Sequence, residues 1–369
     1  MALQKIKEMD LLIIIKEQAK KWVASIAIVL LSVGLLAGCN GKAVQKEAPE
    51  AFEATDFAMG TIISQRVFGA DGQAAIDETT EKMNSLEALL TFNAPGGDVN
   101  KLNENAGKQR VSLDAETLRI INKSQEVSEL SGGAFDATIG PIVKSWGIGS
   151  AGERIPSEAE LHKLLPLVNY QDLIIEGNTG YLKNEGQAVD LGGIAKGYAG
   201  DVAVEIYKKH GIESAFINLG GNVVTMGSKP DGSPWRVGVR NPRPSNAESG
   251  ELVGMVEVID KAVVTAGDDQ RFFEEGGIRY HHILNPHTGY PAQSDLMSIT
   301  LITDSSLEAD ALDTAAFILG LEKGRAMLEQ YGGVEAIFIT QDKKVYVTKG
   351  IKDSFEFNDA SKEYEYVKE

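Results

Sequence analysis

Three of the chain's five histidines lie in the stretch "HHILNPHTGYP", residues 281–291. A histidine cluster raises the question of a zinc site, which needs ligands that can converge on one ion. His281 and His282 are adjacent in a segment with strand character, so we expect their side chains to point to opposite faces. The Asn-Pro and Thr-Gly pairs that follow are typical of turns, which predicts that His287 lies in an exposed loop. The spacing therefore disfavours a zinc site.

A second stretch, "EADALDTAAFILG" (residues 308–320), has oxygen-bearing side chains at helical spacing. Asp310 and Thr314 are four residues apart and share one helical face, and Asp313 lies beside them. A carboxylate, a hydroxyl and nearby backbone carbonyls suit a hard cation such as Mg²⁺ and disfavour zinc. A solvent-exposed polar face with a capped first turn would have the same residues, so the pattern alone leaves both interpretations open.

The third stretch is "VDLGGIAKGYAGD", residues 189–201. Asp190 ends an expected strand, two glycines follow, and a helix begins with Lys196 in its first turn. The glycines permit close approach of the backbone, and the helix N-terminus offers N–H groups and a positive dipole to a phosphate. An ordinary strand-to-helix turn explains the same residues. The pattern is neither a Walker A sequence nor G-x-G-x-x-G.

Three weaker signals are glycine-containing interruptions of expected strands or connections. They are "AMGT" (residues 58–61), "GGAFDATIGPIVKSWGIG" (residues 132–149) and "INLGGN" (residues 217–222). A glycine inside a strand marks a place where a ligand or another backbone can approach closely. Each signal alone is weak.

The elements that must position these residues alternate between strand and helix without an internal repeat. The expected strands are residues 57–69, 173–177, 188–193, 214–227, "WRVGVR", "GMVEVID", "AVVTAG", "RYHHIL" and "MSITLIT", with a final hairpin of "EAIFIT" and "KVYVTK". The expected helices are residues 74–90, 115–130, 194–210, 306–320 and 322–331. This order predicts a mixed α/β (α+β) chain with many antiparallel neighbours.

The N-terminal region has a different composition from the rest of the chain. The uncharged run of 17 residues from Trp22 to Gly38 is short for a membrane-spanning helix and fits a signal peptide, although a single membrane anchor is the alternative. It ends in "LAGC", which looks like a bacterial lipobox, and Cys39 is the only cysteine in the chain. We therefore predict that Cys39 becomes a lipidated N-terminus.

The resulting division of the chain has four parts. We expect residues 1–38 to form a lipoprotein signal peptide, 39–55 a lipidated tether, 56–352 the main folded domain, and 353–369 an acidic tail that frays. Loss of residues 1–38 would change the net charge from −17 to −19. This charge excludes nucleic-acid binding as a general mode, and it also disfavours adhesion to anionic membranes by charge.

Taken together, the stretches resemble one family, the ApbE-type flavin transferases or FAD:protein FMN transferases. The motifs that carry the resemblance occur in the family's order over about residues 57–350: "AMGT", "GGAFDATIGPIVKSWGIG", "VDLGGIAKGYAGD", "NLGGN", "PWRVGVRNP", "HHILNPHTGYP" and "ADALDTAAFILG". The resemblance implies an ApbE-like fold with a barrel-like, largely antiparallel sheet core, flanking helices and an FAD cleft between lobes.

The resemblance also implies a reaction. FMN is transferred from FAD to a threonine or serine hydroxyl of an acceptor protein, AMP leaves, and Mg²⁺ is required. The acceptors in this family are electron-transport subunits or extracellular redox proteins. Because many members are extracytoplasmic lipoproteins, we expect this chain on the extracytoplasmic face of the cell membrane, anchored by lipid.

Residue roles follow from the same resemblance. The residues implied to contact FAD are Met59, Phe92, Ala134 (through its backbone), Asp190, Lys196, His282 and Ile283. The residues implied to bind Mg²⁺ are Gly193 (through its carbonyl), Asp310, Asp313 and Thr314. His282 matches the family histidine before the turn and is the candidate base, with Asp310 as the alternative base.

Two departures from the family pattern leave the flavin contacts less defined. Asn285-Pro286 stands where Asp-Pro is common, and Ala266 replaces a serine in "TAGDD". Two other functions use the same site. One is an FAD pyrophosphatase that gives FMN and AMP, and the other is a lipoprotein that binds FAD without catalysis. The Asp310 and Thr314 pair argues against passive binding, because storage of FAD needs no Mg²⁺.

Overall fold

The structure is a computed structural model that describes residues 49–92, 94–244 and 250–368. The signal peptide and Cys39 therefore lie outside the described residues. Within them, no helix is both long and apolar enough to cross a membrane.

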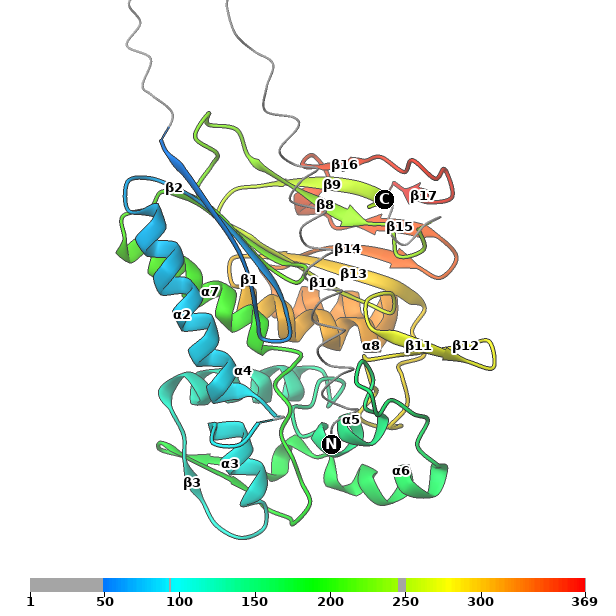
Figure 1. The fold of residues 1–369 in the computed structure, drawn as a ribbon. Coiled ribbons are helices and arrows are strands. Elements are labelled where there is room, and N and C mark those ends of the chain that lie inside the picture. The colour runs from blue at the N-terminus through cyan, green and yellow to red at the C-terminus, as the bar shows by residue number, and fades with distance from the viewer. Residues whose placement is uncertain (1–48, 93, 245–249, 369) are drawn as a thin grey trace, which may run out of the picture. The chain divides into compact units, whose positions relative to one another are not determined.

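The largest element of the described chain is a nine-stranded sheet (Figure 1). Its strands, in spatial order, are β1 (Ala51–Ala58), β2 (Thr61–Phe68), β6 (Ser214–Leu219), β7 (Asn222–Met226), β10 (Ala262–Gly267), β13 (Leu296–Thr303), β14 (Glu335–Thr340), β15 (Lys344–Val347) and β17 (Glu365–Val367). Neighbouring strands are antiparallel except for the parallel pair β15 and β17. The sheet is open, with β1 and β17 at its edges, so the prediction of a barrel-like core is wrong, whereas the mixed α/β class is confirmed.

Three smaller sheets accompany it. The first pairs β16 (Phe355–Phe357), β9 (Leu252–Val258) and β8 (Trp235–Arg240), the second pairs β3 (Val111–Ser112), β5 (Thr179–Leu182) and β4 (Leu173–Glu176), and the third is the hairpin β11 (Phe272–Glu275) and β12 (Ile278–His281). The helices are α2 (Gly72–Leu90), α3 (Asp98–Glu104), α4 (Ala115–Leu130), α5 (Gly140–Trp146), α6 (Glu158–Leu164), α7 (Ala195–Lys209) and α8 (Ser306–Tyr331), with short 3₁₀ turns η1 (Leu165–Leu167), η2 (Tyr170–Asp172) and η3 (Lys349–Ile351).

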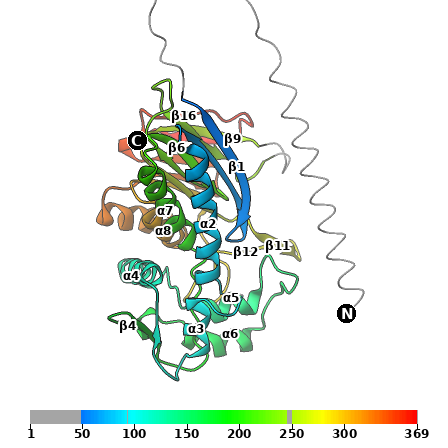
Figure 2. The same cartoon turned by 60° about the vertical axis from the view of Figure 1, so that its left-hand side comes forward.

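The nine-stranded sheet is covered on both faces. Helices α2, α7 and α8 pack on one face, and the sheet β16–β9–β8 packs on the other through a separate apolar cluster that includes Trp235, Val256 and Ile337. Figures 1 and 2 show α3, α5 and α6 on the far side of these helices from the large sheet. All eight residues of β13 are buried, as expected for a central strand that is covered on both faces.

Several chain segments differ from the sequence predictions. Residues 57–69, expected as one strand, cross the turn between β1 and β2, and α3, α5 and α6 were not predicted. The expected tether up to residue 55 is too long, because β1 begins at Ala51 and pairs with β2 through a two-residue turn. Residues 188–193 form no strand and make only an isolated bridge between Ala188 and Ile139. The tail is not frayed, since β16 and β17 join sheets and Phe355 and Tyr364 are buried.

The long helices agree with their predictions because their periodicity and end signals are strong. Helix α4 spans residues 115–130 as expected, and the Asp114 side chain caps it by accepting the Glu116 N–H. Helix α8 contains one non-helical residue, Gly320, at the break predicted between its two halves. The Ser305 side chain caps α8 by accepting the Glu308 N–H, so the first turns of this helix are well defined.

Candidate active site

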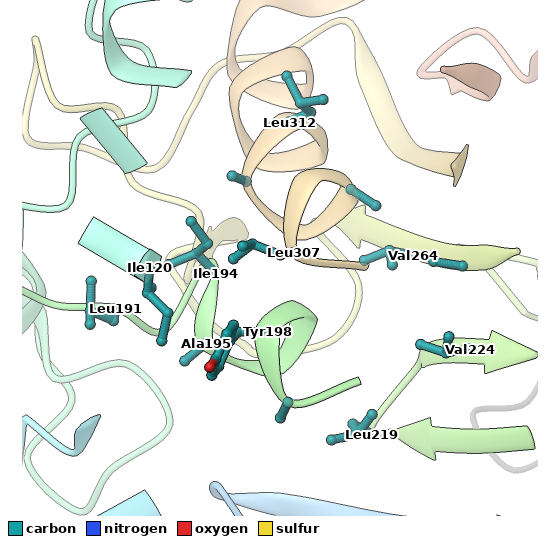
Figure 3. Close-up of a cluster of buried hydrophobic side chains, with 14 of the residues drawn as sticks. Ile120, Leu191, Ile194, Ala195, Tyr198, Leu219, Val224, Val264, Leu307 and Leu312 are labelled. Atoms are coloured by element: carbon teal, nitrogen blue, oxygen red, sulfur yellow. The ribbon is translucent and has the colours of Figure 1, made fainter. Parts of the chain in front are cut away.

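The candidate site lies where the first turns of α7 and α8 pack against each other. Figure 3 shows Ile194, Ala195 and Tyr198 of the α7 start beside Leu307 of α8, in the main apolar core. A Cβ atom on Gly197 would lie 2.2 Å from the Ser306 carbonyl oxygen and 2.6 Å from the Asp310 Cβ. Only glycine therefore permits this approach, which brings the "GGIAKG" turn to Asp310 across 113 residues of sequence.

The Asp310 carboxylate is the centre of the site. It is 4% exposed, and its Oδ2 accepts the backbone N–H of Gly197 at 2.9 Å. Its Oδ1 accepts the Asn222 side-chain amide at 2.7 Å and the Lys196 ammonium at 3.3 Å. These three donors come from two elements, α7 and the start of β7, and together they hold the buried carboxylate in a single orientation.

The other predicted metal ligands lie close to Asp310. Asp313 is 2% exposed, and its Oδ1 accepts a hydrogen bond from the Thr314 hydroxyl at 3.2 Å. Burial raises the pKa of Asp313 well above its ordinary value, and the neighbouring charge of Asp310 adds to the rise. A Cβ on Gly193 would lie 3.6 Å from the Thr314 Oγ1, so the "GG" turn adjoins this helical face.

This set of donors fits a magnesium ion. Two adjacent buried carboxylates are costly without a compensating cation. The other two candidate metal ligands are a hydroxyl and a main-chain carbonyl. All four are oxygen ligands, which Mg²⁺ prefers over the nitrogen and sulfur ligands that suit zinc. No group of three or more His, Cys, Asp or Glu that could hold a metal occurs within the described residues. The proposed ligand set at Asp310 is not a group of that type, because it combines only two carboxylates with a hydroxyl and a main-chain carbonyl.

Asp190 and Lys196 flank the "GG" turn. The Oδ1 of Asp190 accepts the Gly192 N–H at 2.7 Å, and the Lys196 ammonium contacts the Gly192 carbonyl oxygen at 3.4 Å. Burial raises the pKa of Asp190, although the Gly192 N–H and the charge of Arg271 act in the opposite direction. Both residues therefore lie at the start of α7, where the sequence predicts a site for a phosphate.

His282 follows directly after β12 and is half-buried. Its backbone N–H and its Nδ1 both contact the Arg271 carbonyl oxygen, at 3.0 and 3.3 Å. Because a carbonyl oxygen only accepts, Nδ1 carries the proton and Nε2 keeps a free lone pair. Burial lowers the pKa of His282 to about 3, and the positive charges of Arg271 and Lys196 contribute. The imidazole is therefore neutral at physiological pH.

The other two histidines of the cluster have different environments. His281 is buried, its Nε2 lies 3.1 Å from the Ala292 carbonyl oxygen, and its ring packs edge-on against Phe317. His287 is exposed in the turn, where its backbone N–H donates to the Asn285 side chain. The predicted divergence of the three side chains is confirmed.

Met59 occupies the tip of the β1–β2 hairpin. Its φ is 53° and that of Gly60 is 70°, so a methionine adopts the left-handed backbone that favours glycine. Such strain is typical of ligand-contacting positions. The Gly60 carbonyl oxygen accepts a hydrogen bond from the Arg271 side chain at 3.3 Å, which links this tip to the segment before His282.

The remaining predicted FAD contacts lie at the edge of the core. Phe92 follows the end of α2 and is partly buried against the main cluster. Ala134 and Ile283 are buried, and the Ile283 carbonyl oxygen accepts the Ala292 N–H at 2.9 Å. Both residues therefore expose little surface in this structure, and their contacts with FAD stay predictions.

Two residues of the site were not predicted individually. Asn222 donates to Asp310, and Arg271 connects the β1–β2 tip to His282. The "NLGGN" motif was a weak signal for Asn222, whereas nothing in the sequence marked Arg271.

Comparisons with known proteins identify the family of the chain. A family model described as the ApbE family matches residues 59–338. The FAD:protein FMN transferase of Treponema pallidum is 34% identical over 351 residues, which cover 90% of this chain and 94% of that protein. The FAD:protein FMN transferase of Klebsiella pneumoniae is 35% identical over 292 residues, which cover 79% of this chain and 89% of that protein.

Solved structures agree as well. The ApbE protein of Thermotoga maritima matches with a TM-score of 0.76 at 30% identity, covering 83% of this chain and 99% of that one. The flavin transferase ApbE of Vibrio cholerae matches with a TM-score of 0.75 at 26% identity, again covering 83% and 99% of the two chains. Since sequence and fold both agree over most of its length, the chain belongs to the ApbE family.

Proposed function

We propose that the chain transfers FMN from FAD to a threonine or serine hydroxyl of an acceptor protein, releases AMP and requires Mg²⁺. The curated relatives that it matches over most of their length are FAD:protein FMN transferases. The observation that carries the proposal is the convergence of Lys196, the α7 N-terminus and the Asp310 helical face at one point. A cationic side chain, a helix N-terminus and a carboxylate pair are the groups that phosphoryl transfer uses.

The metal role falls to the Gly193 carbonyl, the Asp310 and Asp313 carboxylates and the Thr314 hydroxyl. When bound, Mg²⁺ neutralises the negative charge that develops on the phosphoryl oxygens. The chain supplies the rest of the positive potential through Lys196 and the first N–H groups of α7. This local positive potential is needed to bind a phosphorylated ligand because the chain has a net charge of −17.

The reaction forms one bond and breaks one. The acceptor hydroxyl oxygen attacks the phosphorus of the FMN half of FAD, the bond from that phosphorus to the bridging oxygen breaks, and AMP leaves with the electron pair. The hydroxyl proton passes to a base. His282 is our candidate because its free Nε2 can accept a proton, which it does weakly while its pKa is about 3. The negative charge of bound FAD would raise that pKa towards the useful range.

Other side chains bind and orient FAD in this proposal. Asp190 and Lys196 would contact it beside the "GG" turn, and Met59, Phe92, Ala134 and Ile283 would contact the rest of the FAD molecule. The strained backbone of Met59 and its half-buried side chain support a contact at the hairpin tip. Asp310 remains the alternative base, because it could serve both the metal and the hydroxyl.

The decisive experiment incubates the chain with FAD, Mg²⁺ and an acceptor domain that carries an exposed threonine. In-gel flavin fluorescence on the acceptor supports transfer, whereas free FMN and AMP without labelled acceptor would indicate an FAD pyrophosphatase. FAD binding without turnover would indicate a non-catalytic FAD-binding lipoprotein. Asp310→Ala should abolish turnover, and Glu322→Ala, an exposed acid on the same helix, should leave it unchanged.

We also propose that the mature protein is anchored to the extracytoplasmic face of the cell membrane through lipid on Cys39. The lipobox "LAGC" supports this proposal. The acceptor would then be an electron-transport subunit or an extracellular redox protein reachable from that face. The negative charge gives no reason to expect nucleic acid as a partner.

A further inference from the structure

We propose that Asn222 is a positioning residue that fixes the Asp310 carboxylate in the orientation that binds the metal. This inference rests on the proposed magnesium site and assigns a role to a residue outside the ligand set. The Asn222 Nδ2 to Asp310 Oδ1 distance is 2.7 Å, the shortest of the three contacts that Asp310 accepts. Asn222 is 3% exposed, so this amide lies where water cannot replace its bond.

The turn that precedes Asn222 is itself fixed in place. Gly220 and Gly221 connect β6 to β7 with φ of 62° and 110°. The Gly220 N–H donates to the Ile62 carbonyl oxygen at 3.0 Å, and a Cβ on Gly220 would lie 2.0 Å from the Thr61 Oγ1. The β1–β2 hairpin therefore packs directly on the turn and sets the position of the Asn222 amide.

The chemistry of the amide explains why this residue type suits the position. Lys196 reaches the same Asp310 oxygen from 3.3 Å and carries a positive charge. Without the amide, Oδ1 would be free to move closer to Lys196 and tighten the existing ion pair, which would then compete more strongly with a metal cation. Asn222 holds that oxygen by a neutral donor, so it orients the carboxylate without adding charge that would repel the metal. Partners of this kind orient metal ligands in many proteins.

The test uses Asn222→Leu, which keeps the approximate volume and removes the donor. Calorimetric titration of the full chain with Mg²⁺, with FAD present, should show an affinity about 10–100-fold below that of the unchanged protein. FAD turnover at low Mg²⁺ should fall by a similar factor and recover at saturating Mg²⁺. Recovery distinguishes a positioning role from general damage, because a misfolded site would not regain its kcat.

The control is Asn218→Ala, which removes the acceptor of the Gly221 N–H in the same turn and leaves the Asn222 amide in place. The Mg²⁺ affinity of this control should stay within about twofold of that of the unchanged protein. This change is much smaller than the loss of affinity expected for Asn222→Leu. If Asn222→Leu does not fold, Asn222→Ser serves instead, since its hydroxyl is too short to reach Asp310, and the same loss is expected.

Two results would overturn the inference. Mg²⁺ affinity in the Asn222 variant equal to that of the unchanged protein would remove the positioning role. An equal loss in Asn218→Ala would assign the effect to the turn. Asp310→Ala separates this inference from the proposed function. If Asp310→Ala still binds Mg²⁺ normally, the metal site itself is wrong; if it loses Mg²⁺ while Asn222→Leu does not, only the role of Asn222 fails.

Discussion

Gly197→Ala is the substitution that most directly tests the packing on which the site depends. In an ordinary helix interior, alanine is more favourable than glycine by about 0.5–1 kcal/mol. Here the added Cβ would lie 2.2 Å from the Ser306 carbonyl oxygen, whereas such a carbon–oxygen contact normally needs about 3.3 Å or more. The two helices must then separate by roughly 1 Å, and overpacking of this kind costs about 1–3 kcal/mol.

The steric cost outweighs the helix preference for alanine, because both atoms that the new Cβ meets belong to the rigid start of α8. We expect a net destabilisation of about 1–2 kcal/mol. Gly200→Ala is the matched control, one turn further along α7. Its Cβ would meet the Val224 Cγ2 at 2.7 Å and the Ser306 side chain, which can shift more easily than a backbone carbonyl. Its cost should therefore be smaller.

The assay is urea denaturation of the two variants and the unchanged protein, followed by titration of each with Mg²⁺. Gly197→Ala should lower the free energy of unfolding and weaken Mg²⁺ binding, because the displaced helix moves Asp310 away from the α7 N-terminus. Gly197→Ala could instead stabilise the protein by the amount expected from the helix preference for alanine and leave Mg²⁺ affinity normal. That result would refute the close packing of α7 and α8.

Three other predictions concern separate parts of the chain. Met59→Gly should raise stability by about 1 kcal/mol by relieving the left-handed backbone, and should raise the KM for FAD; unchanged KM would remove Met59 from the FAD site. The depressed pKa of His282 should make stability fall as pH drops from about 6.5 towards about 3, because only the unfolded state takes up the proton in that window. His282→Gln should flatten this dependence in acid denaturation, and an unchanged slope would contradict it. Cys39→Ala should abolish incorporation of labelled palmitate, and continued labelling would place the lipid elsewhere.

The sequence predicted the helices that carry the site better than it predicted the sheets. Helix α4 and the two halves of α8 follow from apolar periodicity, from capping by Asp114 and Ser305, and from the break at Gly320. These signals are local, so each can be read without knowing what packs against the helix. The placement of Asp310 and Thr314 on one face follows from the same periodicity.

What the sequence could not predict depends on partners distant along the chain. Strand β1 begins inside a segment with tether composition, and β17 lies in an acidic tail; each forms because a sheet edge is available to it. The open sheet likewise follows from strand order rather than from any local pattern. Asn222 is an unremarkable residue after two glycines until the fold brings it 2.7 Å from Asp310.

The central claim is that Asp310 and its neighbours support transfer of FMN to a protein hydroxyl. The most direct test is mass spectrometry of an acceptor domain after incubation with the chain, FAD and Mg²⁺, with an acceptor whose threonine is replaced by alanine as the control. The account predicts that the threonine acceptor gains one FMN less one water, that AMP is released in equal amount, and that EDTA or Asp310→Ala prevents both. Release of AMP with FMN left free in solution, or labelling that persists in Asp310→Ala, would contradict it.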